Sequence, residues 1–183
     1  MNGDWLWALP PLIFLISSRI WVISQRGELD DDPVVFFEPK GFFEISDEDW
    51  QRFFEVNVMS GVRFTRHYAP GMAGRGWGRI VFVSSESALN IPKEMIHYGM
   101  TKTAQLSLSR GFAMELAGTG VTVNALLPGP THTENTDRMR AERAKAAGVS
   151  MEQLEKDFFD RFRPSSLNRR FATAQEVANL AAY

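Results

Sequence analysis

Two short apolar runs, separated by a long helical stretch, limit most strongly what this chain can fold into. Residues 79–84 are rich in valine and isoleucine, which is typical of a strand buried in a parallel sheet. Residues 96–117 predict a long helix that ends near Gly118, and residues 121–127 predict the next strand. A strand, a helix and a second strand in this order indicate an α/β fold, in which helices flank a parallel sheet.

The rest of the chain adds mainly helices. Ser46 and the acidic residues that follow it resemble a helix N-terminus. We expect this helix to span residues 47–68 and to end at Pro70-Gly71. The charges of residues 137–163 fit the solvated faces of further helices. Other expected elements are a strand near 33–37, a substitute strand or two within 12–24, and a final helix that begins near Thr173.

Length and composition exclude several classes of protein. The chain has 183 residues, which is enough for one domain with a hydrophobic core. Its hydrophobic content of 44% and charged content of 23% are those of an ordinary globular protein. The net charge of −2 excludes the basic surface typical of nucleic-acid binding. The absence of cysteine excludes disulfides and thiolate metal ligands.

An apolar stretch near the N-terminus does not predict a membrane span. A span needs about 20 predominantly apolar residues, whereas Pro10-Pro11 and Arg19 interrupt this stretch. Nor do histidine and carboxylate residues cluster at the spacing of metal ligands. We therefore expect a cytoplasmic protein with no membrane, nucleic-acid or metal partner.

Three polar residues have the spacing of a site for proton transfer. Tyr98 and Lys102 are four residues apart, so on a helix their side chains share a face. A nearby ammonium favours phenolate, so we expect it to lower the tyrosine pKa from its reference of about 10. Ser85 ends a strand-like run and could hydrogen-bond the same substrate oxygen. Taken alone, the Tyr-x-x-x-Lys pair also fits a solvated helix face.

The order of motifs from residue 36 onward closely resembles that of the short-chain dehydrogenase/reductase family. The motifs are Asn57 in a helical stretch, Gly76-Trp77-Gly78 in a loop, a strand ending at Ser84-Ser85, Tyr98 with Lys102, and a strand followed by Pro128-Gly129. The resemblance implies an incomplete Rossmann-like parallel sheet flanked by helices. It also implies an NAD or NADP cofactor and hydride transfer between a carbonyl and a secondary alcohol of a small-molecule substrate.

The resemblance assigns a role to each matched catalytic side chain. Tyr98 would be the general acid/base and would also contact the cofactor, and Lys102 would tune Tyr98 while holding the nicotinamide ribose. Ser85 would orient the substrate oxygen. Asn57, which has poor helix propensity, would position a water molecule in the proton relay.

The residues after strand 121–127 are expected to contact the cofactor, because ligands bind beyond the carboxyl ends of strands in open α/β sheets. By resemblance to the family, the backbone of Thr131 would meet the nicotinamide carboxamide. Thr133 would bond the carboxamide or the pyrophosphate. Pro128 and Gly129 belong to the same loop and complete this expected cofactor contact.

The front of the chain departs from the family pattern. The family has a glycine-rich turn that brings the backbone close to the cofactor pyrophosphate, whereas Gly27 is the only glycine between Gly3 and Gly41. Asp32-Pro-Val-Val35 stands where the family has Asn-Asn-Ala-Gly, which places cofactor binding in doubt. The sequence does not distinguish NAD from NADP as the cofactor, because the residue that does so in the family follows a second strand that has no counterpart here.

These observations divide the chain into an atypical segment, residues 1–35, and a catalytic portion, residues 36–183, that stops before the last strand of the family sheet. The first hypothesis is an NAD(P)-dependent oxidoreductase. The second is a truncated, catalytically silent remnant or an oligomerisation subunit without its own cofactor site. A weaker option is a split enzyme whose cofactor half lies on another chain. In the family, helices 47–68 and 96–117 pair with their copies, which implies a homodimer or homotetramer.

Overall fold

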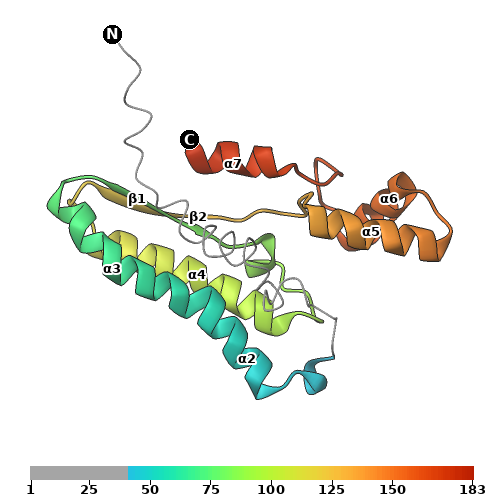
Figure 1. Ribbon diagram of the computed structural model, residues 1–183, viewed down its shortest axis with the longest axis horizontal. Coiled ribbons are helices and arrows are strands. Elements are labelled where there is room, and N and C mark those ends of the chain that lie inside the picture. The colour runs from blue at the N-terminus through green and yellow to red at the C-terminus, as the bar shows by residue number, and fades with distance from the viewer. Residues whose placement is uncertain (1–40) are drawn as a thin grey trace, which may run out of the picture. The chain divides into compact units, whose positions relative to one another are not determined.

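Strands β1 (Gly78–Val83) and β2 (Val121–Leu126) lie side by side in parallel and form the sheet of the described residues (Figure 1). Their register places Gly78 opposite Val121 and Val83 opposite Leu126. Helix α4 (Ile96–Glu115) lies between them in the chain, as the crossover of a parallel pair requires. The α/β fold class predicted from the sequence is confirmed.

The computed structural model describes residues 41–183, which belong to two compact units. The first unit ends at Leu127 and holds both strands. The second unit, Pro128–Tyr183, is mainly helical. The strands expected near 33–37 and within 12–24 lie outside the described residues. Within the described range, no helix is both long enough and apolar enough to cross a membrane.

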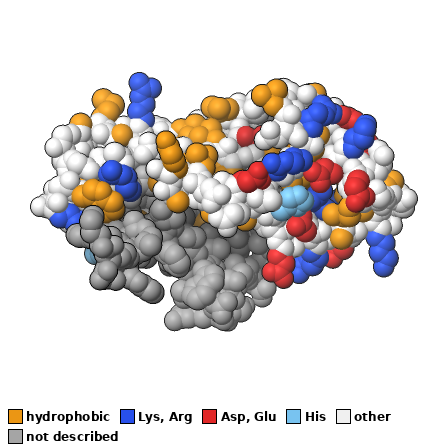
Figure 2. All heavy atoms as spheres, turned by 90° about the horizontal axis from the view of Figure 1, so that it is seen from above, with side chains coloured by type: hydrophobic (Ala, Val, Ile, Leu, Met, Phe, Trp, Pro, Cys, Tyr) orange, Lys and Arg blue, Asp and Glu red, His pale blue; other side chains and the backbone are white. Residues whose placement is uncertain are grey.

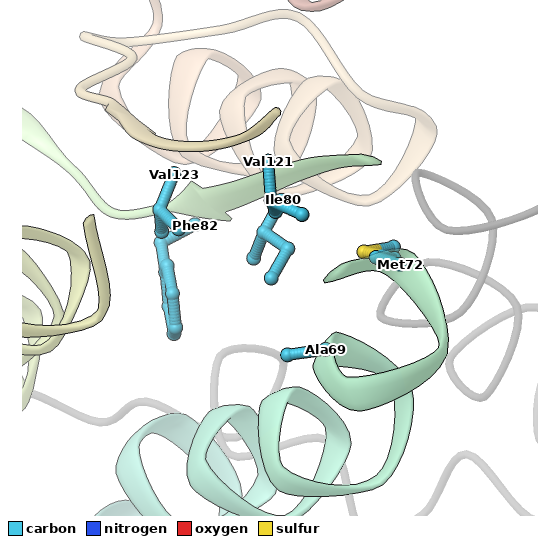
Figure 3. Close-up of a cluster of buried hydrophobic side chains, with 6 residues drawn as sticks. All are labelled: Ala69, Met72, Ile80, Phe82, Val121 and Val123. Carbon is cyan, nitrogen blue, oxygen red and sulfur yellow. The ribbon is translucent and has the colours of Figure 1, made fainter. Parts of the chain in front are cut away.

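Alternate residues of the two strands face a hydrophobic core (Figure 3). The core consists of Ile80 and Phe82 of β1, Val121 and Val123 of β2, and Ala69 and Met72 of helix α3 (Ser60–Gly74). Leu108 and Phe112 of α4 pack against the same cluster, so α3 and α4 cover the same face of the sheet (Figure 1). Val83 points the other way and is 43% exposed.

Helix α2 (Asp47–Phe54), a π-helical turn (Glu55–Met59) and α3 follow one another without a break. The first of them begins where the sequence predicts. The hydroxyl of Ser46 accepts a hydrogen bond from the amide of Asp49 at 3.2 Å, which satisfies one of the free donors at the helix N-terminus.

The expected end of this helical stretch at Pro70-Gly71 is wrong, because α3 continues to Gly74. Proline removes one backbone donor, and the carbonyl four residues earlier, that of Arg66, loses its partner. Both Pro70 and Arg66 lie on the exposed side of α3, where water can bond that carbonyl. The proline is therefore tolerated in the last turns of the helix.

The second unit contains three helices, each with a hydroxyl cap. They are α5 (Glu134–Ala147), α6 (Met151–Phe162) and α7 (Ala174–Ala182), capped by Thr133, Ser150 and Thr173. The charged region predicted over 137–163 is thus two helices. They are separated at Gly148, whose φ of 67° is the left-handed value that glycine adopts readily at a helix C-terminus.

Gly61 sets the close approach of α3 to β1. The residue is buried, and a Cβ added there would lie 2.5 Å from Cε1 of Phe82. Phe82 is 1% exposed, so its ring has little room to move away. A side chain at position 61 therefore has to displace the packed core.

We expect Gly61→Ala to lower the free energy of unfolding by about 1–3 kcal/mol, because the added methyl group overpacks the contact with Phe82. The matched control is Gly111→Ala in α4, where an added Cβ meets nothing within 4 Å. That control should raise stability by about 0.5–1 kcal/mol through helix propensity alone. Urea unfolding of both variants checks the prediction, and equal stabilisation by both would contradict it.

Candidate active site

The polar residues expected to act in catalysis lie around the carboxyl end of β1. The strand ends at Val83, and Ser85 follows it as the N-cap of a short 3-10 helix, where its hydroxyl accepts a hydrogen bond from the amide of Ser87 at 3.2 Å. Helix α4 begins at Ile96, so Tyr98 and Lys102 lie one turn apart on it. The helix predicted to present these two side chains on one face is present.

Lys102 is anchored to the end of β1. Its side chain is buried, and Nζ donates a hydrogen bond to the carbonyl of Val83 at 3.0 Å. In return, the hydroxyl of Ser84 donates to the carbonyl of Lys102 at 2.8 Å. The ammonium lies 5.5 Å from the centre of the Tyr98 ring. The structure therefore brings the lysine and the tyrosine together, with the cation beside the ring.

The pKa of Tyr98 is shifted in the direction opposite to the one expected. Burial raises it above 10, the hydrogen bond with the side chain of Ser85 lowers it, and the charge of Glu86 raises it further. Burial prevails because the phenolate loses more hydration than the neutral phenol. The side chain of Ser85 nevertheless lies close enough to Tyr98 to act on its pKa.

Asn57 lies in the π-helical turn, and its side chain reaches α4. Its Nδ2 donates to the hydroxyl of Thr101 at 3.0 Å, and that hydroxyl donates to the carbonyl of Tyr98 at 2.8 Å. Single π-helical turns inside α-helices occur frequently at functional sites. The hydrogen bonds therefore connect Asn57 to the helical turn that carries the tyrosine.

Thr101 and Gln105 belong to this network, and sequence reasoning missed both. Thr101 has no exposed surface, and Gln105 is 6% exposed. Nε2 of Gln105 donates to the carbonyl of Asn57 at 2.7 Å. The signal in the sequence is their spacing, because positions 98, 101, 102 and 105 fall on one face of a helix. That polar face is buried in spite of its composition.

Four of the residues expected to contact a cofactor lie in the second unit. Thr131 forms a parallel bridge with Ala172, and its hydroxyl donates to the carbonyl of Gly129 at 2.9 Å. The hydroxyl of Thr133 caps α5 by accepting from the amide of Thr136 at 3.2 Å. Together with Pro128 these residues form the turn that precedes α5. Their predicted contacts with the cofactor stay predictions.

A comparison with protein families identifies the class of protein that this fold and these residues define. Residues 37–144 match the profile of the short chain dehydrogenases, which is more than half of the chain. The chain therefore belongs to the short-chain dehydrogenase family.

Individual relatives give the same family. The chain is 48% identical over 165 residues to the uncharacterized oxidoreductase YvrD of Bacillus subtilis, and 42% identical over 147 residues to YvaG of the same organism. These matches cover 89% and 80% of this chain but only 63% and 56% of the two relatives. The chain thus spans less than two thirds of the length of either relative.

Solved structures agree with the fold. The chain is similar to the crystal structure of L-sorbose reductase from Gluconobacter frateurii in complex with NADPH and L-sorbose, with a TM-score of 0.71 and 29% identity. The match covers 79% of this chain and 54% of the reductase. The parallel strands described above are therefore part of a Rossmann-like sheet.

Titration of the tyrosines will test the environment of Tyr98. The chain has three tyrosines, so NMR with isotope-labelled tyrosine Cζ can follow each one, and Tyr98→Phe assigns the signal. We expect the pKa of Tyr98 to lie above 10. In Ser85→Ala it should lie higher still, because the hydrogen bond that lowers it is gone. A pKa of Tyr98 below 10 would refute the assignment.

Replacing Gln105 will test the network around the π-helical turn. Gln105→Met keeps the length of the side chain but removes the donor to the buried carbonyl of Asn57. We expect a loss of about 1–3 kcal/mol of stability, because that carbonyl is left without its partner. Gln51→Met on the exposed side of α2 is the control and should change stability by less than about 0.5 kcal/mol. Equal stability of the two variants in urea would show that the hydrogen bond contributes nothing.

Proposed function

We propose that this chain is an NAD(P)-dependent oxidoreductase that interconverts a small carbonyl compound and a secondary alcohol, with Tyr98 as the general acid/base. One observation carries the proposal. The side chain of Ser85, at the carboxyl end of β1, lies close enough to Tyr98 to lower the pKa of its phenol, and the ammonium of Lys102 lies 5.5 Å from the centre of the tyrosine ring. A phenol, a hydroxyl and a cation in this arrangement can exchange a proton with a substrate oxygen.

The residues of the chain supply the proton chemistry. In carbonyl reduction, Tyr98 donates its phenolic proton to the carbonyl oxygen while the carbon receives a hydride, and the product is a secondary alcohol. A bound reduced nicotinamide supplies that hydride, as it does in other enzymes that use it. Ser85 holds the substrate oxygen next to the phenol. Lys102 stabilises the phenolate that remains, because its charge lies close to the ring.

The raised pKa of Tyr98 fits the proton donor that carbonyl reduction requires. Burial keeps the phenol protonated at neutral pH, which is the form that donates a proton. Alcohol oxidation needs the phenolate instead, and that form is scarce below pH 10. The likeness to L-sorbose reductase, whose structure holds NADPH and L-sorbose, supports a hydroxylated ketone as substrate class and NADPH as the first cofactor to try.

The remaining predicted residues complete the proposal. The carbonyl of Asn57 accepts a hydrogen bond from Gln105, and its second lone pair can hold the water of a proton relay. By family resemblance, the turn before α5 contacts the cofactor through Pro128, Gly129, Thr131 and Thr133. Pairing of α2–α3 and α4 with their copies gives the proposed homodimer or homotetramer.

Titration of the purified chain with NADPH and NADH is the direct test, because the sequence lacks the glycine-rich turn of the family. We expect saturable binding, followed by reduction of a hydroxylated ketone. Tyr98→Phe should lower kcat/KM by about 10²–10⁴-fold through loss of the general acid, whereas Tyr68→Phe serves as the control. No binding by a folded sample would contradict the proposal and favour a subunit without its own cofactor site.

The pH dependence gives a second check on the same variant series. Reduction needs protonated Tyr98, so its rate should stay level through neutral pH and fall as the pH rises through the tyrosine pKa, above 10. Oxidation needs the phenolate, so its rate should rise over the same range. A reduction rate that falls well below pH 10 would identify a different proton donor.

A further inference from the structure

Helices α5 and α6, together with Phe171, line an open cavity of about 420 Å³ that none of the proposed catalytic or cofactor-binding residues lines. We call it the α5–α6 cavity. Its walls include four apolar side chains, Met139, Leu154, Phe158 and Phe162, and two cationic ones, Arg143 and Arg161. Small-molecule sites are commonly clefts of about 300–1,000 Å³ with mainly apolar walls and a few polar groups, so the α5–α6 cavity has the size and composition of such a site.

The wall of the cavity is fixed by a partly buried ion pair. Arg140 also lines the cavity, and its Nη2 bonds Oε2 of Glu155 at 2.6 Å while Nη1 bonds Asp137 at 3.2 Å. Its guanidinium lies over the ring of Phe171, 4.0 Å from the centre. The charge of Arg140 is thus neutralised by two carboxylates, and the residue holds α5, α6 and Phe171 in place.

The other two arginines of the cavity wall, Arg143 and Arg161, differ from Arg140 in their ion pairing. Among the described residues, no carboxylate lies within ion-pair distance of Arg143 or Arg161. Asp157, the acid that lines the cavity, accepts a hydrogen bond from Nε2 of Gln153 at 2.7 Å. The guanidinium of Arg161 lies over the ring of Phe162, 5.2 Å from its centre, and Phe162 is half exposed. Both arginines line the apolar cavity and have no carboxylate partner in the described part of the chain.

Figure 2 shows hydrophobic side chains between basic and acidic ones over the α5–α6 part of the surface. An apolar cavity beside two arginines without carboxylate partners is complementary to an apolar molecule with a negative end. Carboxylates are well matched to guanidinium groups, because the two planar groups form parallel hydrogen bonds.

We propose that the α5–α6 cavity binds a small amphipathic carboxylate, with its apolar body against Met139 and Phe158 and its carboxylate paired with Arg143 and Arg161. This site lies wholly within the second unit. The proposal goes beyond the oxidoreductase function and does not rest on it, because it needs neither the cofactor nor turnover.

Titration with octanoate, followed by NMR of isotope-labelled methionine methyl groups, tests the proposal on the full chain. The chain has eight methionines, and Met139→Leu assigns the signal inside the cavity. We expect a saturable shift of the Met139 signal with one octanoate per chain. Octanol has the same tail without the charge and should bind at least about tenfold more weakly.

Charge variants make the test specific. Arg143→Gln combined with Arg161→Gln should weaken octanoate binding at least about tenfold, whereas Lys145→Gln, which removes a cation from the same helix outside the cavity, should leave it unchanged. The proposal is overturned by no saturable shift of Met139 up to about 10 mM octanoate. Equal binding of octanol, or equal octanoate binding in the double variant, overturns it as well. The octanoate titration contains no nicotinamide cofactor, so its outcome is independent of whether the chain acts as an oxidoreductase.

Discussion

Two reciprocal hydrogen bonds join the carboxyl end of β1 to the middle of α4, and the arrangement of the candidate active site depends on them. Ser84 donates to the carbonyl of Lys102, and the ammonium of Lys102 donates to the carbonyl of Val83. Buried polar groups are costly unless they are paired, so neither element can slide past the other without losing both bonds. With Lys102 fixed in this way, helical geometry alone places Tyr98 one turn earlier, beside Ser85.

Helix α4 buries two faces of opposite character. Leu108 and Phe112 pack into the hydrophobic core beneath the sheet, whereas Thr101 and Gln105 bond the π-helical turn. The apolar face contributes stability in proportion to the area that it removes from water. The polar face fixes where α4 lies against the π-helical turn, because each of its hydrogen bonds has a required direction. Core packing and placement of the tyrosine are therefore properties of the same helix.

Much of this arrangement could be predicted from the sequence, because it depends on local patterns. Strand-forming runs, the hydroxyl cap at Ser46 and the i, i+4 spacing of Tyr98 and Lys102 each depend on neighbours in the chain. The continuation of α3 through Pro70 could not be predicted, because it depends on which side of the helix faces water. The raised pKa of Tyr98 was missed for a similar reason. The spacing showed the nearby cation, but burial by residues distant in sequence decides the direction of the shift.

In the charged helices of the second unit, the local charge pattern does not predict the environment of every residue. The sequence pattern predicts a solvated face, yet one carboxylate of that region has an internal role. Glu155 bonds Arg140 through Oε2 and accepts the backbone amide of Phe171 through Oε1 at 3.0 Å. A partly buried ion pair of this kind adds little net stability, because desolvation offsets the attraction, but loss of Glu155 would leave the buried guanidinium of Arg140 without its nearer carboxylate. The pair therefore fixes how α5, α6 and Phe171 meet. Because Glu155 is already bonded to Arg140, it does not neutralise Arg143 or Arg161, and these two cations outnumber Asp157, the one further carboxylate in the cavity lining.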